Sequence, residues 1–380
     1  MSRYAHPFFD QIGNRPPEAT AAALAPKHAW AKTKLGRIPP VRGNGVIQLD
    51  EILGAGTSAE FIGAGKMVFH AGGDSGIPGG SSEAEAVAEA MALDYHVNQS
   101  ATNPAFLMHL GDVIYGPGKS DHYLDEFYRP YSGYPGKILA IPGNHDGELT
   151  SRDPDSLAAF LANFCTPLAV PAPAADAVRI PRETMTLPGA YWMLEAPFVR
   201  IIGLYSNFAE NPGFLEGEAG DPSQLDWLKK TLNGLTGKTD KALVIATHHP
   251  PFSQSSHAGS QEMLGEIETI CEAAKVYPDL FLSGHAHNYQ RFLRKAQGKQ
   301  TPFLVNGCLG HGAQAVKPPD GTETNGTTYV KAVECYGFLR ITVSAAKILI
   351  QMVQVLSGGT QIVDECTVDL ATHTVSEAGA

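Results

Sequence analysis

Five short polar motifs, each directly after a run of apolar residues, constrain the fold of this 380-residue chain more than any other feature. The apolar runs are short and bordered by glycine or proline, which is typical of buried strands. They cover residues 67–71, 105–110, 138–141, 243–246, 280–282 and 303–305. Between them lie segments with apolar residues at helical spacing, at 83–98, 222–235 and 261–274. Strands that alternate with helices predict a layered α/β domain.

Further strands are expected outside this alternating region. A strand pair with a proline turn is predicted at 191–194 and 198–204. Three consecutive antiparallel strands are predicted near the C-terminus, at 338–343, 348–355 and 361–368. These late strands are expected to extend the sheet or to add a second one.

The chain is expected to have three parts. Residues 1–65 are interpreted as an irregular N-terminal extension, 66–370 as a single domain, and 371–380 as a tail. Within the domain, Ser82 and Glu85 have capping-box spacing and predict the start of the first helix.

Charge, hydropathy and cysteine usage exclude several classes of protein. The net charge of −11 argues against nucleic acid as the main partner. No apolar run approaches the roughly 18 residues that a membrane span needs. The start of the chain lacks the apolar stretch of a secretory signal, so a cytoplasmic protein is expected, although a mature secreted chain would look similar. The five cysteines show no CxxC spacing and are interpreted as free thiols.

The five polar motifs supply residue types that bind metal ions. In chain order they are Gly73-Asp74-Ser75-Gly76, Gly111-Asp112-Val113-Ile114-Tyr115, Gly143-Asn144-His145-Asp146, Thr247-His248-His249-Pro250 and Gly284-His285-Ala286-His287. Carboxylate, carboxamide, imidazole and phenolate groups together suit borderline-to-hard transition metals. Strand ends are also where α/β sheets place ligands. The order of the motifs therefore predicts a metal centre at one edge of the sheet.

The order GD, GDxxY, GNH, H, GHxH resembles the purple acid phosphatases, a group within the calcineurin-like metallophosphoesterases. The match covers roughly residues 66 to 310. Most of the wider superfamily begins with DxH, where this chain has Gly76, and Tyr115 fills the gap as in the purple subfamily. The resemblance implies two packed mixed β-sheets flanked by helices, with a βαβαβ metal-binding core.

The resemblance also implies which residues hold two metal ions. The first ion would be bound by Asp74, Asp112, Tyr115 and His287, and the second by Asp112, Asn144, His248 and His285. His248 is preferred over His249 because the family's ligand stands two residues before the proline. A phenolate ligand favours Fe(III) at the Tyr115 site, and the second ion would be Fe(II), Zn(II) or Mn(II).

Three further residues are expected to take part in the reaction. His145 matches the family's histidine that protonates the leaving group, and Asp146 is expected to orient it. His257 matches, by its spacing from His248, a histidine that contacts the phosphate. For His122, His249 and His311 a structural role is favoured over a role at the site.

The activity implied is hydrolysis of a small phosphate monoester by a hydroxide that bridges the two metals. The alternatives are a phosphodiesterase of the same superfamily, a non-hydrolytic iron or phosphate-binding protein, and a binding module without activity. The sequence leaves open the natural substrate, the second metal, the pH optimum and the oligomeric state.

Overall fold

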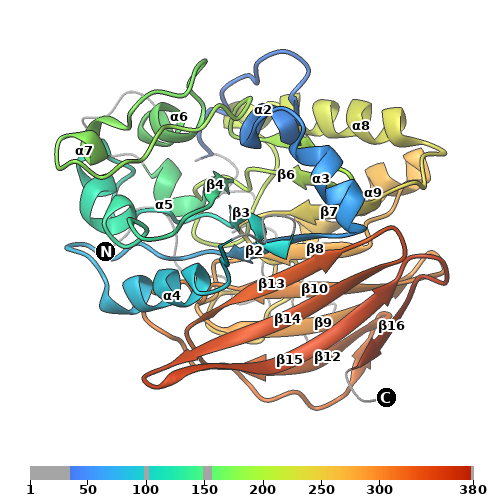
Figure 1. Ribbon diagram of the computed structural model, residues 1–380. Coiled ribbons are helices and arrows are strands. Elements are labelled where there is room, and N and C mark those ends of the chain that lie inside the picture. Colours follow the sequence, from blue (N-terminus) through green and yellow to red (C-terminus); the bar gives the residue numbers. More distant parts are fainter. Residues whose placement is uncertain (1–34, 98–101, 149–155, 378–380) are drawn as a thin grey trace.

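The apolar runs form the inner strands of two β-sheets that pack face to face (Figure 1). The computed structural model describes residues 35–97, 102–148 and 156–377. The α/β architecture with two mixed sheets, predicted from the sequence, is confirmed.

One sheet has seven strands. Its order is β16 (Thr374–Glu377), β15 (Gly359–Asp369), β14 (Lys347–Leu356), β13 (Gly337–Val343), β2 (Met67–Gly72), β3 (Pro104–His109) and β4 (Lys137–Ala140). The strands β2, β3 and β4 run parallel, and β13 joins the antiparallel C-terminal strands to β2. The three predicted C-terminal strands therefore extend the sheet that begins with β2.

The other sheet has nine strands. Its order is β1 (Val46–Gln48), β5 (Trp192–Glu195), β6 (Val199–Gly203), β7 (Ala242–Ala246), β8 (Leu280–Ser283), β10 (Lys299–Asn306), β9 (Tyr289–Ala296), β12 (Thr327–Val333) and β11 (Glu323–Thr324). The central strands β6, β7, β8 and β10 are parallel. Both sheets therefore direct the carboxyl ends of parallel strands toward loops that can share one site.

Helices flank the two sheets. The long helices α8 (Ser223–Leu235) and α9 (Gln261–Ala274) pack against each other, and α4 (Ser82–Ala92) lies against β13 and β14 (Figure 1). Shorter helices are α5 (Asn144–Gly147), α6 (Ala158–Phe164) and α7 (Pro173–Asp176). In the part of the chain that the structure describes, no helix is long and apolar enough to cross a membrane.

The two chain ends differ from the sequence interpretation. Residues 46–64, expected to be irregular, form β1 and the helices α2 (Leu49–Leu53) and α3 (Thr57–Ala64). The strand β1 pairs with β5, so this part of the predicted extension belongs to the nine-stranded sheet. The predicted C-terminal tail contributes β16, which pairs with β15. The cap of α4 is Ser81 instead of Ser82, because the Ser81 hydroxyl accepts from Ala84 N.

Candidate metal centre

Five strand ends bring the sequence motifs together. Asp74, Asp112 and Asn144 follow β2, β3 and β4, which are neighbours in the seven-stranded sheet. His248 follows β7, and His285 and His287 follow β8, its neighbour in the nine-stranded sheet. All six side chains are buried, as is Tyr115. The structure thus brings all seven predicted metal ligands to one region between the sheets.

Backbone strain marks three of these positions. Asp74, Asp112 and His285 have φ angles of 65°, 51° and 68°, in the left-handed region that residues with a Cβ rarely adopt. Such conformations persist only where the surroundings enforce them, and they cluster at functional sites. Each strained residue turns its side chain toward the gap between the two sheets directly after a strand.

Glycines in the motifs allow the loops to approach one another. A Cβ on Gly143 would lie 2.1 Å from Asp112 Oδ1, and a Cβ on Gly284 would lie 2.6 Å from Asp74 Oδ2. Both distances are too short for any side chain. The GN and GH pairs of the sequence therefore reflect close approach of backbone to the two carboxylates.

One group of side chains centres on Tyr115. Its hydroxyl lies 2.9 Å from Asp74 Oδ1 and 2.9 Å from His287 Nε2. His287 Nε2 also lies 3.4 Å from Asp74 Oδ1. A phenol, a carboxylate and an imidazole therefore surround one point, and these are three of the four residues predicted to hold the first metal.

The position of Gly76 explains why a tyrosine is needed here. A Cβ on Gly76 would lie 2.8 Å from Ile114 Cα and 2.9 Å from Glu126 Oε2. No histidine can occupy this position as it does in the DxH motif. Glu126 is fixed there because its carboxylate accepts from Tyr115 N at 2.6 Å.

A second group of side chains centres on His248. Its Nδ1 must donate to Leu110 O at 2.9 Å, since a carbonyl has no proton to give. A neutral ring then presents a lone pair at Nε2, which lies 3.0 Å from Asn144 Oδ1 and 3.3 Å from Asp112 Oδ2. Three acceptors facing one another require a cation, either a proton on the ring or a metal ion.

His285 completes this second group. Asp112, His248 and His285 offer ligand atoms that all lie within 4.8 Å of one another. His285 Nε2 lies 3.3 Å from the carboxamide oxygen of Asn211, a fully buried residue. An Nε2–H bonded to this oxygen leaves Nδ1 as the lone pair available to a metal, and such outer partners commonly fix the orientation of ligating histidines.

Burial and neighbouring charges shift the pKa values of Tyr115, His248 and His285 away from their ordinary values. Burial and the nearby Asp74 and Asp112 raise the pKa of Tyr115 well above its ordinary value, so a phenolate needs a cation beside it. Burial opposes a charge on His248, but Asp112 and Asp74 raise its pKa to about 9. Burial and the neighbouring His257 hold the pKa of His285 well below its ordinary value, which keeps that ring neutral as a ligand must be.

His145 lies beside this centre, but its orienting partner is not the one predicted. His145 Nδ1 lies 3.2 Å from Glu148 Oε2. Asp146 instead accepts from the backbone N–H groups of Gly143, Val113 and Ile114, at 2.8, 3.2 and 3.3 Å. The prediction that Asp146 orients His145 is therefore wrong, because the turn of α5 directs Asp146 back to the backbone at its own N-terminus.

Burial and nearby carboxylates shift the pKa values of both His145 and Asp146. Although burial opposes a charge on His145, Asp112 and Glu148 raise its pKa to about 9. Burial and the nearby Asp112 raise the pKa of Asp146 to about 7, against the hydrogen bonds from Gly143 and Val113. His145 thus lies between two carboxylates, Asp112 and Glu148, that favour its protonated form.

Other histidines border the centre. The His257 ring is centred 4.3 Å from that of His285, and its Nε2 lies 3.1 Å from Gln314 Nε2. His311 stacks on Tyr115, with ring centres 3.4 Å apart, and its Nδ1 is bonded to Gly76 O, so it borders the site through contacts that a structural role also explains. His249 has the structural role expected, with Nδ1 bonded to Ser206 Oγ and Nε2 to Ala209 O at 2.7 Å each.

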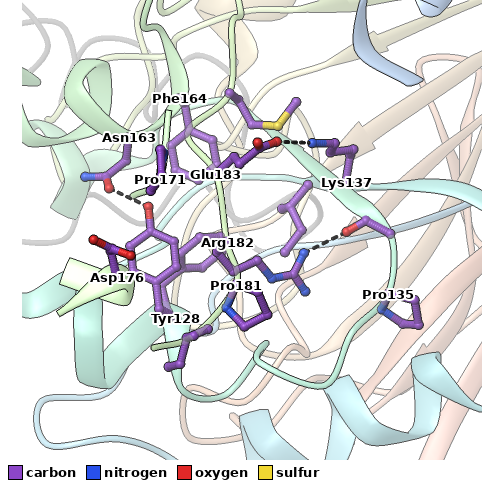
Figure 2. A pocket seen from close by; sticks show the side chains of 15 residues that line it. Tyr128, Pro135, Lys137, Asn163, Phe164, Pro171, Asp176, Pro181, Arg182 and Glu183 are labelled. Carbon is purple, nitrogen blue, oxygen red and sulfur yellow. Dashed lines mark hydrogen bonds and ion pairs between the residues drawn. The ribbon is translucent and has the colours of Figure 1, made fainter. Parts of the chain in front are cut away.

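A cavity of about 430 Å³ lies apart from these residues, at the other end of β4 (Figure 2). Its wall includes Arg182, which donates to the carbonyl oxygens of Gly136 and Tyr131, and Lys137, which pairs with Glu183 at 3.0 Å. Figure 2 shows these polar groups bonded to one another. The cavity has no predicted site residue in its wall, so it is not the place where the motifs act.

Taken together, the side chains fit a dinuclear metal centre. Two buried carboxylates, a buried phenol, a carboxamide and three histidines converge with more acceptors than protons to share among them. Their oxygen and nitrogen donors suit borderline-to-hard ions, and Asp112 contributes to the group around His248 while lying close enough to shift the pKa of Tyr115.

Comparisons with known proteins agree with this geometry. A sequence profile described as calcineurin-like phosphoesterase matches residues 70–289, more than half of the chain. A probable purple acid phosphatase, number 20 of Arabidopsis thaliana, is 34% identical over 103 residues, which are 26% of this chain and 21% of that protein. The chain thus matches only about a fifth of the length of this curated relative.

Two solved structures share the fold at low sequence identity. One is described as "GAP50 the anchor in the inner membrane complex of Plasmodium", with a TM-score of 0.57, 12% identity, and coverage of 79% of this chain and 87% of that one. The other is PhoD, with a TM-score of 0.52, 14% identity, and coverage of 83% of this chain and 72% of that one. With the profile match, the motif order and the converging ligands, the chain belongs to the calcineurin-like phosphoesterase family, a family of metal-dependent phosphoester hydrolases.

Proposed function

We propose that this chain is a purple-acid-phosphatase-like phosphomonoesterase. In this proposal Asp74, Asp112, Tyr115 and His287 hold Fe(III), and Asp112, Asn144, His248 and His285 hold Fe(II), Zn(II) or Mn(II). The observation that carries it is the Tyr115 hydroxyl, 2.9 Å from both Asp74 Oδ1 and His287 Nε2. Closure of the Gly76 position supports it, because the DxH arrangement of the wider superfamily has no room here.

When bound, two such ions activate a water molecule as nucleophile and neutralise charge on the phosphoryl oxygens. Asp74, Asp112 and a Tyr115 phenolate together carry three negative charges against the five positive charges of Fe(III) and a divalent ion. The centre therefore keeps a net positive charge within a protein of net charge −11, which supports an anionic substrate.

His145 has the place and the partner of a proton donor to the leaving group. Its Nδ1 is engaged by Glu148 Oε2 at 3.2 Å, so Nε2 is the nitrogen left to hand a proton to the departing oxygen. Glu148 fixes the orientation of the ring by this bond. Positioned acids of this kind contribute roughly 10²- to 10⁴-fold to the rate.

His257 has a free donor for a phosphate oxygen. If Gln314 Nε2 donates to His257 Nε2 at 3.1 Å, the ring carries its proton on Nδ1. This Nδ1 is buried and has no hydrogen-bond partner among the residues that the structure describes. A substrate oxygen would satisfy it.

A phosphodiester substrate is the second candidate, and the carboxylates beside His145 and His257 favour it. Glu210 Oε1 lies 3.9 Å from His257 Nδ1, and Glu148 lies against His145. A diester has one negative charge where a monoester has up to two, so these carboxylates oppose its binding less. Rates on matched aryl monoesters and diesters separate the two candidates.

The test of the metal assignment is the visible spectrum of the purified protein together with its metal content. A violet band with about two metal ions per chain, at least one of them iron, is the expected result. Tyr115→Phe should abolish the band and keep the fold. Tyr123→Phe, at a buried hydroxyl that no described residue bonds, should leave both the band and the fold unchanged. A colourless protein with two divalent ions would overturn the purple assignment.

A further inference from the structure

The segment between β10 and β11 lies against two loops of the candidate metal centre and is bonded to both through its backbone. Gln314 N donates to His287 O at 2.8 Å, and Gln314 O accepts from Asn288 Nδ2 at 3.3 Å. Three residues further on, Lys317 N donates to Gln254 O at 3.1 Å. Gln314 therefore has a fixed backbone beside a predicted metal ligand, although it belongs to none of the sequence motifs.

The Gln314 side chain reaches from this backbone to His257. Its Nε2 lies 3.1 Å from His257 Nε2, and its Oε1 accepts from Ser256 Oγ at 3.4 Å. Burial lowers the pKa of His257 to about 4, so the ring is neutral at neutral pH. An amide nitrogen can only donate, so His257 Nε2 accepts and the single ring proton is on Nδ1.

The other side of the ring agrees with this tautomer. His257 Nδ1 is buried, and none of the described residues forms a hydrogen bond with it. Glu210 Oε1 lies 3.9 Å from this nitrogen, and an ionised carboxylate there favours a proton on Nδ1. Burial raises the pKa of the Glu210 carboxyl, so the Gln314 amide is the contact on which the assignment rests. The ring itself borders the predicted ligands, with its centre 4.3 Å from that of His285 and 5.6 Å from that of His287.

The position of the ring proton determines what His257 can offer to a phosphate. With the proton on Nδ1, this nitrogen is a donor that the protein does not use among its described residues. With the proton on Nε2, it would present a lone pair, which repels a phosphoryl oxygen. A neutral imidazole can adopt either form, and the hydrogen bond at one nitrogen selects the form.

We propose that Gln314 is a positioning residue that holds the proton of His257 on Nδ1, where it can be donated in a hydrogen bond to a phosphoryl oxygen. This inference rests on the proposed binding of a phosphate ester at the same centre. It gives the segment after β10 a part in recognising the phosphoryl group. Gln314 binds neither the substrate nor a metal ion and acts through His257 alone.

Calorimetry with inorganic phosphate on the metal-loaded protein measures this role without turnover. Gln314→Met keeps an unbranched side chain and removes the amide donor, so the Kd for phosphate should rise about tenfold. His257→Ala should raise the Kd at least as much, and the double variant should bind no more weakly than His257→Ala alone. The control is Gln361→Met, at an exposed glutamine whose amide donates to Gln354, and it should leave the Kd unchanged.

The tautomer itself can be measured from the ¹⁵N shifts of the histidine rings in protein loaded with diamagnetic Zn(II). The signals that disappear in His257→Ala belong to His257. We expect a protonated Nδ1 in the wild type and a larger share of protonated Nε2 in Gln314→Met. A protonated Nε2 in the wild type would contradict the proposal.

The outcomes separate this inference from the proposed function. Unchanged phosphate affinity in Gln314→Met, or losses that add up in the double variant with His257→Ala, would overturn the role of Gln314 whether or not the protein hydrolyses esters. A wild type that binds two metals and phosphate but hydrolyses neither aryl monoesters nor aryl diesters would overturn the proposed function, while the effect of Gln314→Met on phosphate affinity could still be measured. A metal-loaded wild type that does not bind phosphate would overturn both.

Discussion

Two clusters of charged side chains, one buried and one that joins buried Arg291 and Asp364 to the exposed Glu377, differ in whether the chain itself balances their charges. Between the sheets near the C-terminus, Arg291 on β9 forms bidentate pairs with Asp364 on β15 and Glu377 on β16, at 2.6 to 3.0 Å. Tyr289 also donates to Asp364, at 2.7 Å. Every donor there meets an acceptor. In the candidate metal centre, by contrast, acceptors face acceptors around His248, and the Tyr115 phenol would need a cation to ionise.

This difference separates a structural cluster from a functional one. The Arg291 cluster is complete without a ligand and ties β9 of one sheet to β15 and β16 of the other. The metal centre is incomplete and strained, with left-handed backbone at Asp74, Asp112 and His285. A buried polar cluster that the chain leaves unsatisfied points to a ligand that completes it.

The largest difference between the two clusters is expected at Asp112, whose carboxylate we expect to bind both metal ions. Asp112→Asn keeps the shape of the side chain and removes its charge, so both ions should be lost and hydrolysis abolished, while the fold is retained. Elemental analysis, circular dichroism and an aryl phosphate assay measure the three quantities. A variant that keeps two metal ions would contradict the bridging role.

The matching change in the other cluster should affect stability and leave catalysis intact. Arg291→Met leaves Asp364 buried without its cation, and such losses cost about 3 to 5 kcal/mol of unfolding free energy. The Asp364→Asn change made together with Arg291→Met should recover part of that loss. Denaturant unfolding measures both, and kcat of the folded variant should match the wild type. A fall in kcat larger than the loss of folded protein would show that the clusters are coupled.

Much of this site could be predicted from the sequence because its ligands are tied to strand ends. Short apolar runs identify the strands, and the polar residues that follow each run lie at the end of that strand. Because β2, β3 and β4 are neighbours in one sheet, Asp74, Asp112 and Asn144 converge as expected. The strand β9 was missed because its sequence, YQRFLRKA, carries charged residues that a buried strand rarely holds. Its Arg291 is buried only because two acids from distant strands meet it, which local pattern cannot reveal.

The residues around the ligands were harder to predict than the ligands. Adjacency in sequence favours Asp146 as the partner of His145, but helical geometry brings the i, i+3 neighbour, Glu148, to the ring. Asn211 and Glu210 belong to a loop without a motif, and only tertiary contacts such as the bond between His249 and Ala209 place them. Long-range contacts of this kind leave no local signal in one sequence.

Substitutions at Asn211 test whether residues that contact the predicted metal ligands, without binding the metal themselves, also affect metal affinity. Asn211→Ala removes the acceptor 3.3 Å from His285 Nε2, and loss of such an orienting partner lowers metal affinity by about 10- to 100-fold. Asn211→Asp keeps an oxygen at that place and should restore affinity, since the Asn211 Nδ2 has no partner to lose in the described part of the chain. Competition with a metal chelator measures both variants. If the alanine variant binds metal as tightly as the wild type, Asn211 does not orient His285 for metal binding.

The smallest expected effect comes from a third cluster, which is partly buried and in which, as around Arg291, the charged groups pair with one another. Asp94 lies 2.9 Å from His70 Nε2 and accepts from Arg340, and although burial opposes its charge, these bonds hold the pKa of Asp94 below its ordinary value. The stability it contributes is therefore present well above pH 3.8 and lost as pH falls through the lowered folded-state pKa. Burial lowers the pKa of His70, which adds a loss of stability in the same direction below about pH 6.5. Asp94→Asn should cost about 1 to 3 kcal/mol of unfolding free energy at pH 7. The difference from wild type should shrink as the pH falls below 3.8 toward the lowered folded-state pKa of Asp94. Denaturant unfolding across this pH range measures the difference, and a gap that stays constant would mean that Asp94 contributes through packing and not through its charge.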